Sequence, residues 1–385
     1  MRNENCIYCA GPLYLVYDFG NQPLSNALLR DENQKDNLYP LRLLHCAKCD
    51  LYQSNRTDLD FFSDDYPYFS SINSTYKKQC QEFYSARLQN VSKDVNILEI
   101  GCNDGYLLSE LQKMGFTNLY GYEPASKQAM EAARFGTVHN CTFDITSFGK
   151  VPKMDYVILN NVFAHTTKLT EILESLKLVC KPDCTIYIEV QDFQTLAKEN
   201  AWDTIYHEHV SYFTYESVYN VVSKYFQITD FHHIPSHGGS LRLLLTPKVI
   251  PDYQFGKRYS TIDVDTFKRM IRTSKHNSLR EILTWKVTHA KRIACFGAAA
   301  KGIAWLNYLG LDSDTIEYCV DETPSKIGKF MPKSKIPIIS LEDHLKRKRP
   351  DIMLILPWNF KSEIKTKLKT ENCVIKNLDG SFSNV

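Results

Sequence analysis

The alternation of strands and helices is the feature that most constrains the fold of this chain. Between about residues 94 and 245, helical patterns separate short apolar runs, namely NILEI, LYGYE, YVILN and TIYIEV. A second alternation runs through RIACFG, AAAKGIAWLNYLG, IEYCVDE and DIMLILP. Because strand–helix–strand repeats pair their strands in parallel, the sequence predicts two α/β domains built on parallel sheets.

Length and charge limit the kinds of partner. A chain of 385 residues suits more than one domain, and its net charge of +2 gives no indication of nucleic acid or a membrane surface. The N-terminus reads MRNENC, and no stretch approaches the roughly 20 apolar residues that span a bilayer. We therefore expect a cytoplasmic protein, a monomer or small homo-oligomer, with no nucleic-acid or membrane partner.

Four of the twelve cysteines form two close pairs, Cys6-x2-Cys9 and Cys46-x2-Cys49. Each pair can present two thiolates to one ion, and two pairs complete the tetrahedral sulfur site that zinc prefers. The pattern predicts a structural Zn²⁺ site. The alternatives are two unrelated pairs of free thiols, or a redox C-x-x-C, which is disfavoured because neither pair follows a βαβ pattern. The other eight cysteines are scattered, which fits a reducing compartment better than a disulfide scaffold.

The segment NILEIGCNDGYLLSEL predicts a strand, a glycine-rich turn and a helix. Gly101 and Gly105 allow the backbone to approach a ligand closely, and Asp104 can cap the helix. The spacing G-x-x-x-G differs from G-x-G-x-x-G, so a phosphate cradle is not expected. The next strand ends in Glu123, whose carboxylate can accept hydrogen bonds from both hydroxyls of a ribose.

Three histidine-containing segments follow. NNVFAHTTKL places Asn160 and His165 just beyond the strand YVILN, at the edge where open α/β sheets bind ligands. WDTIYHEHVSYFT contains the consecutive residues 206–209, and HGGSLRLL brings Ser240 and Arg242 behind two glycines. In an extended segment, neighbouring side chains of 206–209 would point to opposite sides. The alternative is an aromatic strand whose histidines lie on the surface and have no functional role. Four ionisable or phenolic groups in succession favour a functional site instead.

The sequence EIGCNDG followed by GYEP resembles the class I methyltransferases, which use S-adenosylmethionine (SAM). This resemblance implies that Glu99 and the 101–105 loop bind the methionine part of SAM and that Glu123 binds its ribose. The implied cofactor-binding residues are Glu99, Gly101, Asn103, Asp104, Gly105, Glu123 and Asn160.

The resemblance extends over nearly the whole chain. The cysteine quartet, EIGCNDG, NVFAH, DTIYHEHVSYF and HGGSLR occur in the order seen in nucleotide-sugar C-methyltransferases, and FGAAAKG, VDETPSKIGKFMPKSKIPI and LILPWNF also fit. This implies a small N-terminal zinc-binding module over 1–75, a class I methyltransferase Rossmann-like domain over 76–250 and a second Rossmann-like α/β domain over 251–385. A junction is expected at TPKVIPDYQFGKRY, residues 246–259.

The same family adds a methyl group to the carbon beside the ketone of a nucleotide-linked deoxy keto-sugar, through an enolate. Such a reaction needs a base at the carbon and a hydrogen-bond donor at the enolate oxygen. His209 is interpreted as the base and Tyr206 as the donor. His165 is the alternate base, and Glu208 orients the histidines or a sugar hydroxyl.

Six residues are predicted to bind the sugar nucleotide: Tyr66, Tyr68, His207, Ser240, Arg242 and Lys301. Lys301 lies in the FGAAAKG turn, which should not bind SAM because a lysine stands where close backbone approach is needed. That turn either meets substrate phosphates or is a plain strand-to-helix connection.

Three other functions fit parts of the pattern. A sugar O-methyltransferase would also need a base, so the motifs separate it poorly from a C-methyltransferase. A zinc-containing RNA methyltransferase is disfavoured by the near-neutral charge and the absence of a basic stripe. A binding protein that merely retains the SAM fold is disfavoured because His165, Tyr206 and His209 are all present.

Overall fold

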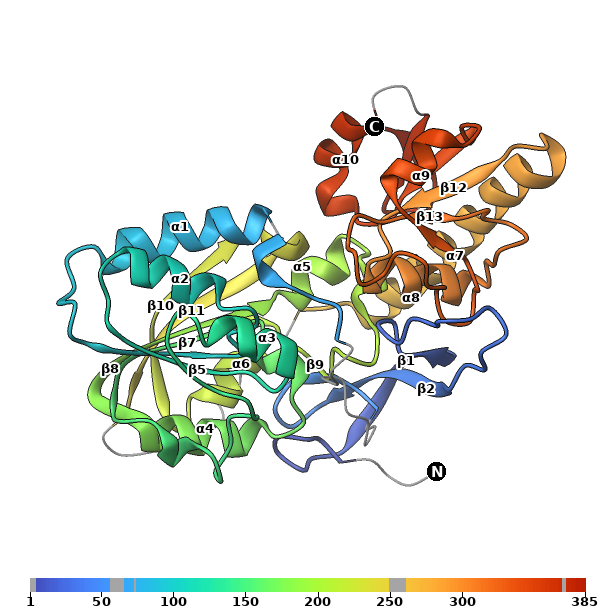
Figure 1. Cartoon of the computed structure of the whole chain (residues 1–385). Helices are drawn as coiled ribbons and strands as arrows, with labels where there is room; N and C mark the ends of the chain where they lie inside the picture. The colour runs from blue at the N-terminus through green and yellow to red at the C-terminus, as the bar shows by residue number, and fades with distance from the viewer. Residues whose placement is uncertain (1–4, 56–65, 73, 249–260, 369–371) are drawn as a thin grey trace.

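The computed structural model describes residues 5–55, 66–72, 74–248, 261–368 and 372–385, whose strands form three sheets. Figure 1 shows a central domain and a C-terminal domain side by side, with the N-terminal strands along the C-terminal domain. The α/β fold with two largely parallel sheets is confirmed. The expected junction at 246–259 falls mostly on residues 249–260, which lie outside the described residues.

The N-terminal sheet has four antiparallel strands in the order β1-β2-β3-β9. Three of them come from the N-terminus: β1 (Leu13–Pro23), β2 (Leu38–Cys46) and β3 (Tyr52–Ser54). The fourth, β9 (Ser211–Tyr212), comes from the middle of the chain and directly follows the YHEH segment. The sheet therefore holds the YHEH segment against the N-terminal module.

The central domain is built on a seven-stranded sheet in the order β10-β11-β8-β7-β4-β5-β6, in which β10 and β11 are antiparallel. Its strands are β4 (Asn96–Ile100), β5 (Asn118–Tyr122), β6 (Thr137–His139), β7 (Met154–Asn160), β8 (Cys180–Gln191), β10 (Phe226–Ile234) and β11 (Ser240–Pro247). Its helices are α1 (Ser74–Leu88), α2 (Tyr106–Lys113), α3 (Ser126–Ala132), α4 (Leu169–Val179), α5 (Phe193–Lys198) and α6 (Tyr215–Val222). Apolar side chains of α1 and α2 pack on one face of the sheet, and those of α4 and α6 pack on the other.

The C-terminal domain has a six-stranded sheet in the order β14-β13-β12-β15-β16-β17, parallel except for β17. Its strands are β12 (Ile293–Phe296), β13 (Cys319–Val320), β14 (Ile338–Ile339), β15 (Ile352–Ile355), β16 (Cys373–Lys376) and β17 (Phe382–Asn384). Its helices are α7 (Val264–Leu283), α8 (Ala300–Leu309), α9 (Leu341–Lys346) and α10 (Lys361–Lys367).

Several single-turn helices connect these elements. They are η1 (Ser70–Ile72), η2 (Phe148–Lys150), η3 (Phe163–His165), η4 (Trp202–Thr204), η5 (Ser236–Gly238) and η7 (Trp358–Phe360), and a π-helical turn η6 (Thr284–Thr288) follows α7. Three of them, η3, η4 and η5, carry or precede segments that the sequence singled out.

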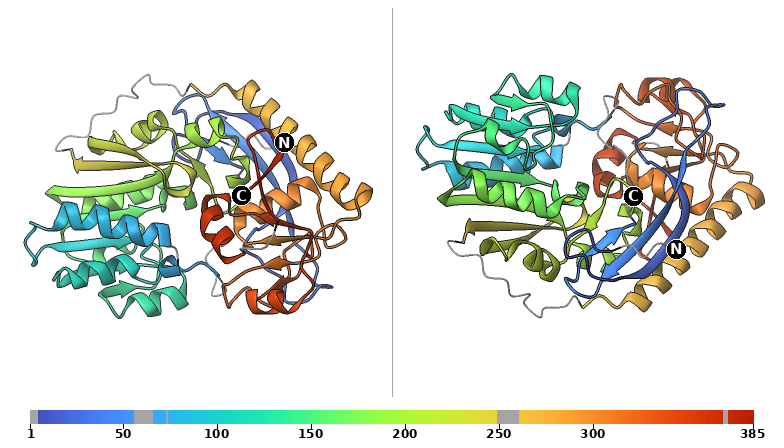
Figure 2. Two further views of the ribbon diagram at one scale, coloured as in Figure 1. Left: turned by 90° about the horizontal axis from the view of Figure 1, so that it is seen from above. Right: turned by 90° about the horizontal axis from the view of Figure 1, so that it is seen from below.

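One of the buried apolar clusters contains residues from all three parts. Phe19 of β1, Trp202 of η4 and Leu306 of α8 belong to the same buried cluster. Both views of Figure 2 show β1 and β2 lying against the C-terminal domain, and β1 contacts α7 and α8. Burial of this shared apolar surface stabilises the arrangement. Across the ranges that the structure describes, no helix has the length and apolar character needed to cross a membrane.

Candidate active site and zinc centre

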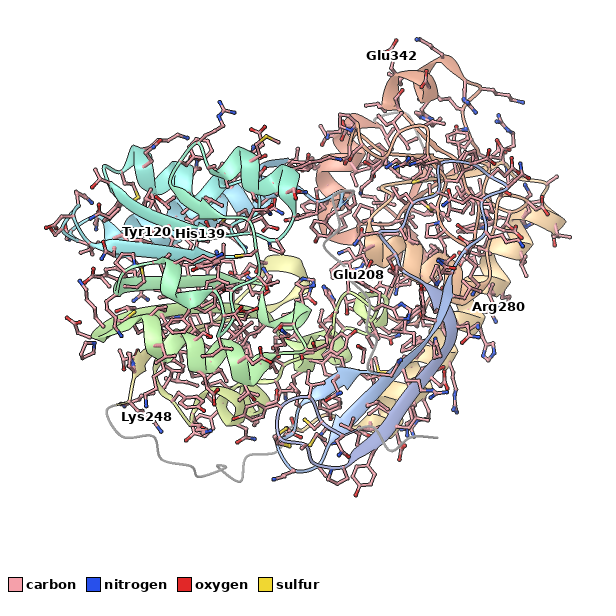
Figure 3. The ribbon with its side chains drawn as sticks, turned by 60° about the horizontal axis from the view of Figure 1, so that its bottom comes forward. Tyr120, His139, Glu208, Lys248, Arg280 and Glu342 are labelled. Carbon is pink, nitrogen blue, oxygen red and sulfur yellow. The ribbon has the colours of Figure 1, made fainter. Side chains whose placement is uncertain are left out.

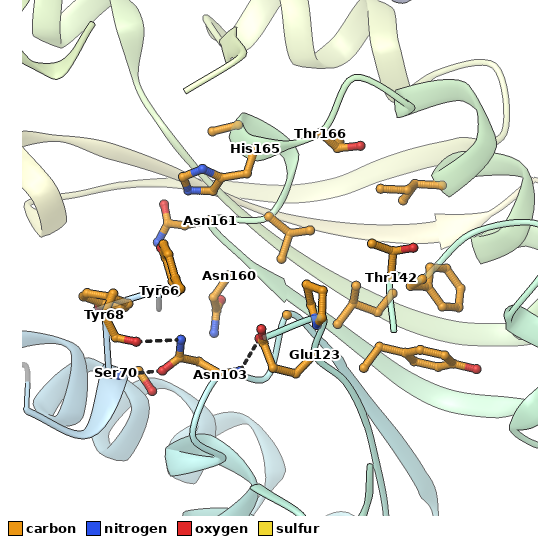
Figure 4. A pocket seen from close by; sticks show the side chains of 18 of the residues that line it. Tyr66, Tyr68, Ser70, Asn103, Glu123, Thr142, Asn160, Asn161, His165 and Thr166 are labelled. Atoms are coloured by element: carbon orange, nitrogen blue, oxygen red, sulfur yellow. Dashed lines mark hydrogen bonds between the residues drawn. The ribbon is translucent and has the colours of Figure 1, made fainter. Parts of the chain in front are cut away.

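A cavity of about 390 Å³ opens at the carboxyl ends of β4, β5 and β7. This is the edge of a parallel sheet where α/β proteins bind ligands. Figure 4 shows Glu123 and Asn103 on one side of it and His165 on the other. The predicted site residues that line the cavity are Tyr66, Tyr68, Gly101, Asn103, Glu123, Asn160, His165, Tyr206 and His209.

The turn between β4 and α2 requires its glycines. Gly101 and Gly105 have φ angles of +68° and +76°, which L side chains rarely adopt. A Cβ on Gly101 would lie 2.8 Å from Val162 Cγ2, and one on Gly105 would lie 2.7 Å from Ala132 Cα. The backbone can therefore form this wall of the cavity only without side chains at these two positions.

Glu123 follows the last residue of β5, and its side chain is held by the backbone. One carboxylate oxygen accepts from the N–H of Asn103 and the other from the N–H of Ala125, both at 2.9 Å. Burial raises the pKa of Glu123, while these two hydrogen bonds oppose the shift because they favour the charged form. The carboxylate lines the cavity in a fixed orientation, as a ligand for ribose hydroxyls requires.

Glu99 lies in β4 and is 2% exposed. Oε1 accepts a 3.5 Å hydrogen bond from the hydroxyl of Tyr76, whereas Oε2 has no hydrogen-bond partner among the described residues. Burial, and then the carboxylates of Asp104 and Glu123, raise the pKa of Glu99 well above its usual value. A buried acceptor of this kind fits a cationic group such as the ammonium of SAM, because a buried polar atom gains most from a charged partner.

Asp104 does not cap α2, so that prediction is wrong. The N-cap of α2 is Gly105, without a side-chain cap. The Asp104 carboxylate instead accepts from the Ser70 hydroxyl at 2.5 Å and from the Ser71 N–H at 3.2 Å. It does not line the cavity but ties the segment 66–72 to the glycine turn.

This segment brings two predicted substrate residues to the cavity. Gln128 donates from Nε2 to the carbonyls of Tyr66 and Tyr68, at 2.9 and 3.0 Å. Asn103 donates from Nδ2 to the Tyr68 carbonyl at 3.2 Å. Both tyrosines are thus placed by contacts with the central domain.

Tyr206 and His209 form a hydrogen-bonded pair. The hydroxyl of Tyr206 lies 2.9 Å from Nε2 of His209, and Nδ1 of His209 lies 2.8 Å from the carbonyl oxygen of Thr204. Because a carbonyl only accepts, Nδ1 carries the hydrogen and Nε2 accepts from Tyr206. The segment turns back after η4, since the His209 N–H bonds the Tyr206 carbonyl at 3.0 Å, so the two side chains meet.

His165 stands beside this pair. Its Nδ1 donates to the carbonyl of Glu208 at 2.7 Å, and its ring centroid lies 5.0 Å from that of His209. Each histidine therefore carries its hydrogen on Nδ1, where a backbone carbonyl accepts it. A neutral imidazole held in this way has its basic lone pair on Nε2.

Glu208 and His207 do not line the cavity. Oε1 of Glu208 accepts from the N–H of Asn26 at 2.9 Å, and Oε2 has no hydrogen-bond partner in the described parts of the chain. Burial raises the pKa of Glu208. Figure 3 labels Glu208 where the central domain meets the N-terminal strands. His207 is 1% exposed and approaches the Pro40 carbonyl at 3.2 Å, on the N-terminal module.

Ser240, Arg242 and Lys301 also lie outside the cavity. Arg242 forms a buried ion pair with Glu189, with Nη2 2.6 Å from Oε2. Ser240 lines a second space of about 1080 Å³ between the central and C-terminal domains. The Lys301 ammonium lies 4.2 Å from the centroid of the Trp358 ring, and burial lowers its pKa to about 8.

The sequence reasoning missed other residues that line the cavity: Tyr76, Thr142, Phe143, Asp144, Asn161, Thr166 and Gln191. Thr142, Phe143 and Asp144 follow β6, the next parallel strand beyond β5. The rule that placed Glu123 and Asn160 at strand ends would have found them, had the short strand β6 been recognised.

The four N-terminal cysteines meet at one point. Their sulfur atoms all lie within 4.8 Å of one another, with Cys6 to Cys49 at 3.5 Å and Cys9 to Cys46 at 3.4 Å. Four sulfurs about 2.3 Å from a tetrahedral zinc ion would be separated by about 3.8 Å. The arrangement fits Zn²⁺, and because all four ligands come from the protein the site is closed and structural.

Comparisons with known proteins find matches to three successive parts of the chain. Three family models match: "Putative zinc binding domain" at residues 6–57, "Methyltransferase domain" at 72–225 and "C-methyltransferase C-terminal domain" at 235–374. The C-methyltransferase NovU of Streptomyces niveus is 28% identical over 389 residues, covering 94% of this chain and 91% of that protein.

Solved methyltransferase structures are similar to about half of the chain at low identity. An S-adenosylmethionine-dependent methyltransferase from Clostridium acetobutylicum is 12% identical with a TM-score of 0.37, covering 49% of this chain and 92% of that one. The magnesium protoporphyrin IX methyltransferase of Synechocystis, solved with bound SAH, is 13% identical with a TM-score of 0.37, covering 46% and 88%. In chain order the three models describe a zinc-binding domain, a methyltransferase domain and a C-methyltransferase C-terminal domain, and together with the similarity to NovU they support a SAM-dependent methyltransferase.

Proposed function

We propose that the protein transfers a methyl group to the carbon beside the ketone of a nucleotide-linked deoxy keto-sugar, through an enolate. One observation carries the proposal. A single cavity has Glu123 at one end and the groups of His165, Tyr206 and His209 at the other. A cofactor held at the first end and a sugar at the second would meet inside it.

Glu123 would hold the ribose of SAM, Glu99 its ammonium group, and the backbone of the turn at Gly101 its methionine part. When bound, SAM supplies an electrophilic methyl group. The protein contributes placement, because a displacement at the methyl carbon requires the attacking carbon to lie in line with the bond that breaks.

His209 is assigned as the base. Its Nε2 removes a proton from the carbon beside the ketone, and the electron pair moves onto the ketone oxygen. Before the reaction, this same lone pair of Nε2 accepts a hydrogen bond from the Tyr206 hydroxyl. Proton transfer therefore releases that hydroxyl, which can donate to the enolate oxygen as its charge develops. The enolate carbon would then form a bond with the methyl group as the methyl–sulfur bond of the cofactor breaks, and the electron pair of that bond would stay on the sulfur.

His165 and Glu208 support this reaction from the other side of the pair. His165 is the alternate base, because its Nδ1 is occupied by the Glu208 carbonyl and it lines the same cavity. Glu208 orients His165 through that carbonyl, while its carboxylate binds the Asn26 N–H. Its proposed role is positional.

Of the six proposed substrate residues, Tyr66 and Tyr68 face the sugar. Ser240 lines the second space at the domain boundary, and Lys301 lies over the ring of Trp358, which also lines it. The nucleotide part of the substrate is proposed to extend into this space. His207 and Arg242 act through their neighbours, namely the N-terminal module and Glu189. We further propose that the protein acts in the cytoplasm as a monomer or small homo-oligomer, without a nucleic-acid partner.

Mass spectrometry of candidate nucleotide keto-sugars incubated with SAM and the protein tests the proposal. The expected product is heavier by one methyl group, located on the carbon beside the ketone. Methylation of a sugar hydroxyl would identify a sugar O-methyltransferase instead. Methyl transfer to tRNA or rRNA, with no reaction on any keto-sugar, would overturn the proposed substrate class.

A further inference from the structure

The turn η4 carries the carbonyl that holds His209. The Thr204 oxygen accepts the Nδ1–H of His209 at 2.8 Å, and this fixes which imidazole nitrogen faces Tyr206. The turn itself is closed by the Thr204 N–H to the Ala201 carbonyl, at 3.1 Å. Any contact that holds η4 in place therefore also holds the imidazole of His209 in its orientation.

Asp203, the middle residue of η4, is held by the C-terminal domain. It is 2% exposed, and it is the one residue of the turn with a charged side chain. The indole N–H of Trp358 donates to Oδ2 at 3.2 Å, and the Lys376 ammonium lies 3.7 Å from the same oxygen. Because a buried carboxylate is costly without partners, the position of Asp203 depends on these two residues.

The partners of Asp203 are themselves fixed. The Lys376 ammonium lies 4.9 Å from the ring centroid of Trp202, the preceding residue of η4. Trp358 packs on the glycine loop before β11, where a Cβ on Gly238 would lie 2.3 Å from its Cη2. Burial lowers the pKa of Lys376, and the charge of Asp203 opposes that shift. The cluster is thus a buried contact between η4 and the C-terminal domain.

We infer that Asp203 is a positioning residue through which Trp358 and Lys376 of the C-terminal domain hold the Thr204 carbonyl against the Nδ1–H of His209. These two residues lie outside the cavity around His209, so they act on the imidazole only through the turn. The orientation of His209 that these contacts set does not depend on the identity of the substrate.

Nitrogen NMR of protein labelled at histidine tests the inference directly, because the two ring nitrogens of a neutral imidazole resonate differently in each tautomer. The chain has 11 histidines, and the signal of His209 is identified by its loss in His209→Gln. The wild type should show the Nδ1–H tautomer for His209. Asp203→Asn and Trp358→Phe should lose that signature or mix it with the other tautomer.

Trp305→Phe is the matched control. It makes the same change at a tryptophan of the same domain that is 3% exposed and whose indole N–H has no hydrogen-bond partner among the described residues. Its His209 signal should stay as in the wild type. SAM affinity within about twofold of wild type, measured by calorimetry, checks that each variant is folded.

Two outcomes would overturn the inference. In the first, a folded Asp203→Asn or Trp358→Phe protein keeps the wild-type tautomer of His209. In the second, Trp305→Phe disturbs it as strongly as Trp358→Phe. If Asp203→Asn does not fold, Trp358→Phe still tests the role of Asp203. That substitution removes one hydrogen-bond donor to Asp203 and keeps an aromatic ring against Gly238.

Discussion

The hydroxyl of Tyr206 donates a 2.9 Å hydrogen bond to Nε2 of His209, whose Nδ1–H is bound by the Thr204 carbonyl. A histidine with both nitrogens engaged in this way has a defined tautomer and a defined direction for its basic lone pair. The same hydroxyl hydrogen cannot serve His209 and a substrate oxygen at once. The bond between Tyr206 and His209 must therefore break during the proposed reaction, and the two residues should behave differently when substituted.

Replacing His209 by Ala should leave SAM affinity unchanged and lower turnover by about 10² to 10⁴, which is the usual cost of losing a general base. The measurement is exchange of the hydrogen beside the ketone with deuterated solvent, in the presence of a non-reactive SAM analogue. Exchange as fast as in wild type would show that His209 is not the base and would make His165 the next candidate.

Replacing Tyr206 by Phe should remove stabilisation of the enolate and lower turnover by about 10² to 10³. The carbon hydrogen should still exchange with solvent, more slowly than in wild type and faster than in His209→Ala. Tyr212→Phe is a suitable control, since that hydroxyl bonds the Tyr206 carbonyl at 3.5 Å and does not line the cavity. If Tyr206→Phe abolished exchange while His209→Ala did not, the roles of the two residues would be reversed.

Much of the fold followed from the period of the apolar residues. The apolar strand segments and the glycine turn predicted both parallel sheets. Such local patterns can be read from the sequence because they do not depend on contacts with distant residues. The bend that brings Tyr206 to His209 was not predictable, since it depends on η4, which packs against the C-terminal domain. For the same reason the sequence could not show that β9 joins the N-terminal sheet.

Two side chains are held by partners that the sequence pattern does not reveal. Arg242 was expected at the substrate, yet its partner Glu189 lies on the neighbouring strand β8, 53 residues away in sequence. Asp104 was expected to cap the helix that follows it, yet its carboxylate accepts a hydrogen bond from Ser70, which lies 34 residues earlier in the sequence. Side chains whose chemistry suits a ligand equally suit a buried protein partner, and only the register of the strands and loops distinguishes the two.

Substitution of the zinc ligands should remove the metal and destabilise the N-terminal module. Serine at Cys6, Cys9, Cys46 or Cys49 leaves an incomplete tetrahedral site, and binding of structural zinc contributes directly to folding. Metal analysis should find one zinc per wild-type chain and less than one in each variant. Cys141→Ser, at a cysteine outside the cluster, should keep the full zinc content. Wild-type protein purified without chelators that contained no zinc would contradict the prediction.

Gly101→Ala should lower both stability and SAM affinity. The position has a φ of +68°, and the added methyl carbon would lie 2.8 Å from Val162 Cγ2. Strain of this kind costs about 1–3 kcal/mol. Thermal denaturation and calorimetry measure the two effects. Gly149→Ala is the matched control, because no atom lies within 4 Å of its added Cβ, and it should be close to neutral.

Binding of SAM should release a proton, and Glu99 should be its source. Burial and the neighbouring acids raise the pKa of Glu99 well above its usual value, so the free protein holds a proton on this carboxyl over a range where an ordinary glutamate is ionised. An ammonium group against Glu99 lowers that pKa again, because it favours the carboxylate. Between the two pKa values, binding expels the proton, and SAM affinity should rise with pH.

Calorimetry in two buffers with different ionisation enthalpies measures this proton. The wild type should show a buffer-dependent enthalpy of SAM binding, whereas Glu99→Gln should bind more weakly and show none. Glu131→Gln, which replaces an exposed carboxylate that pairs with Arg134, should behave as wild type. If the binding enthalpy of the wild type did not depend on the buffer across the acidic and neutral range, Glu99 would already be ionised in the free protein. The effect of Glu99→Gln on SAM affinity would then be the remaining evidence that Glu99 binds the ammonium group.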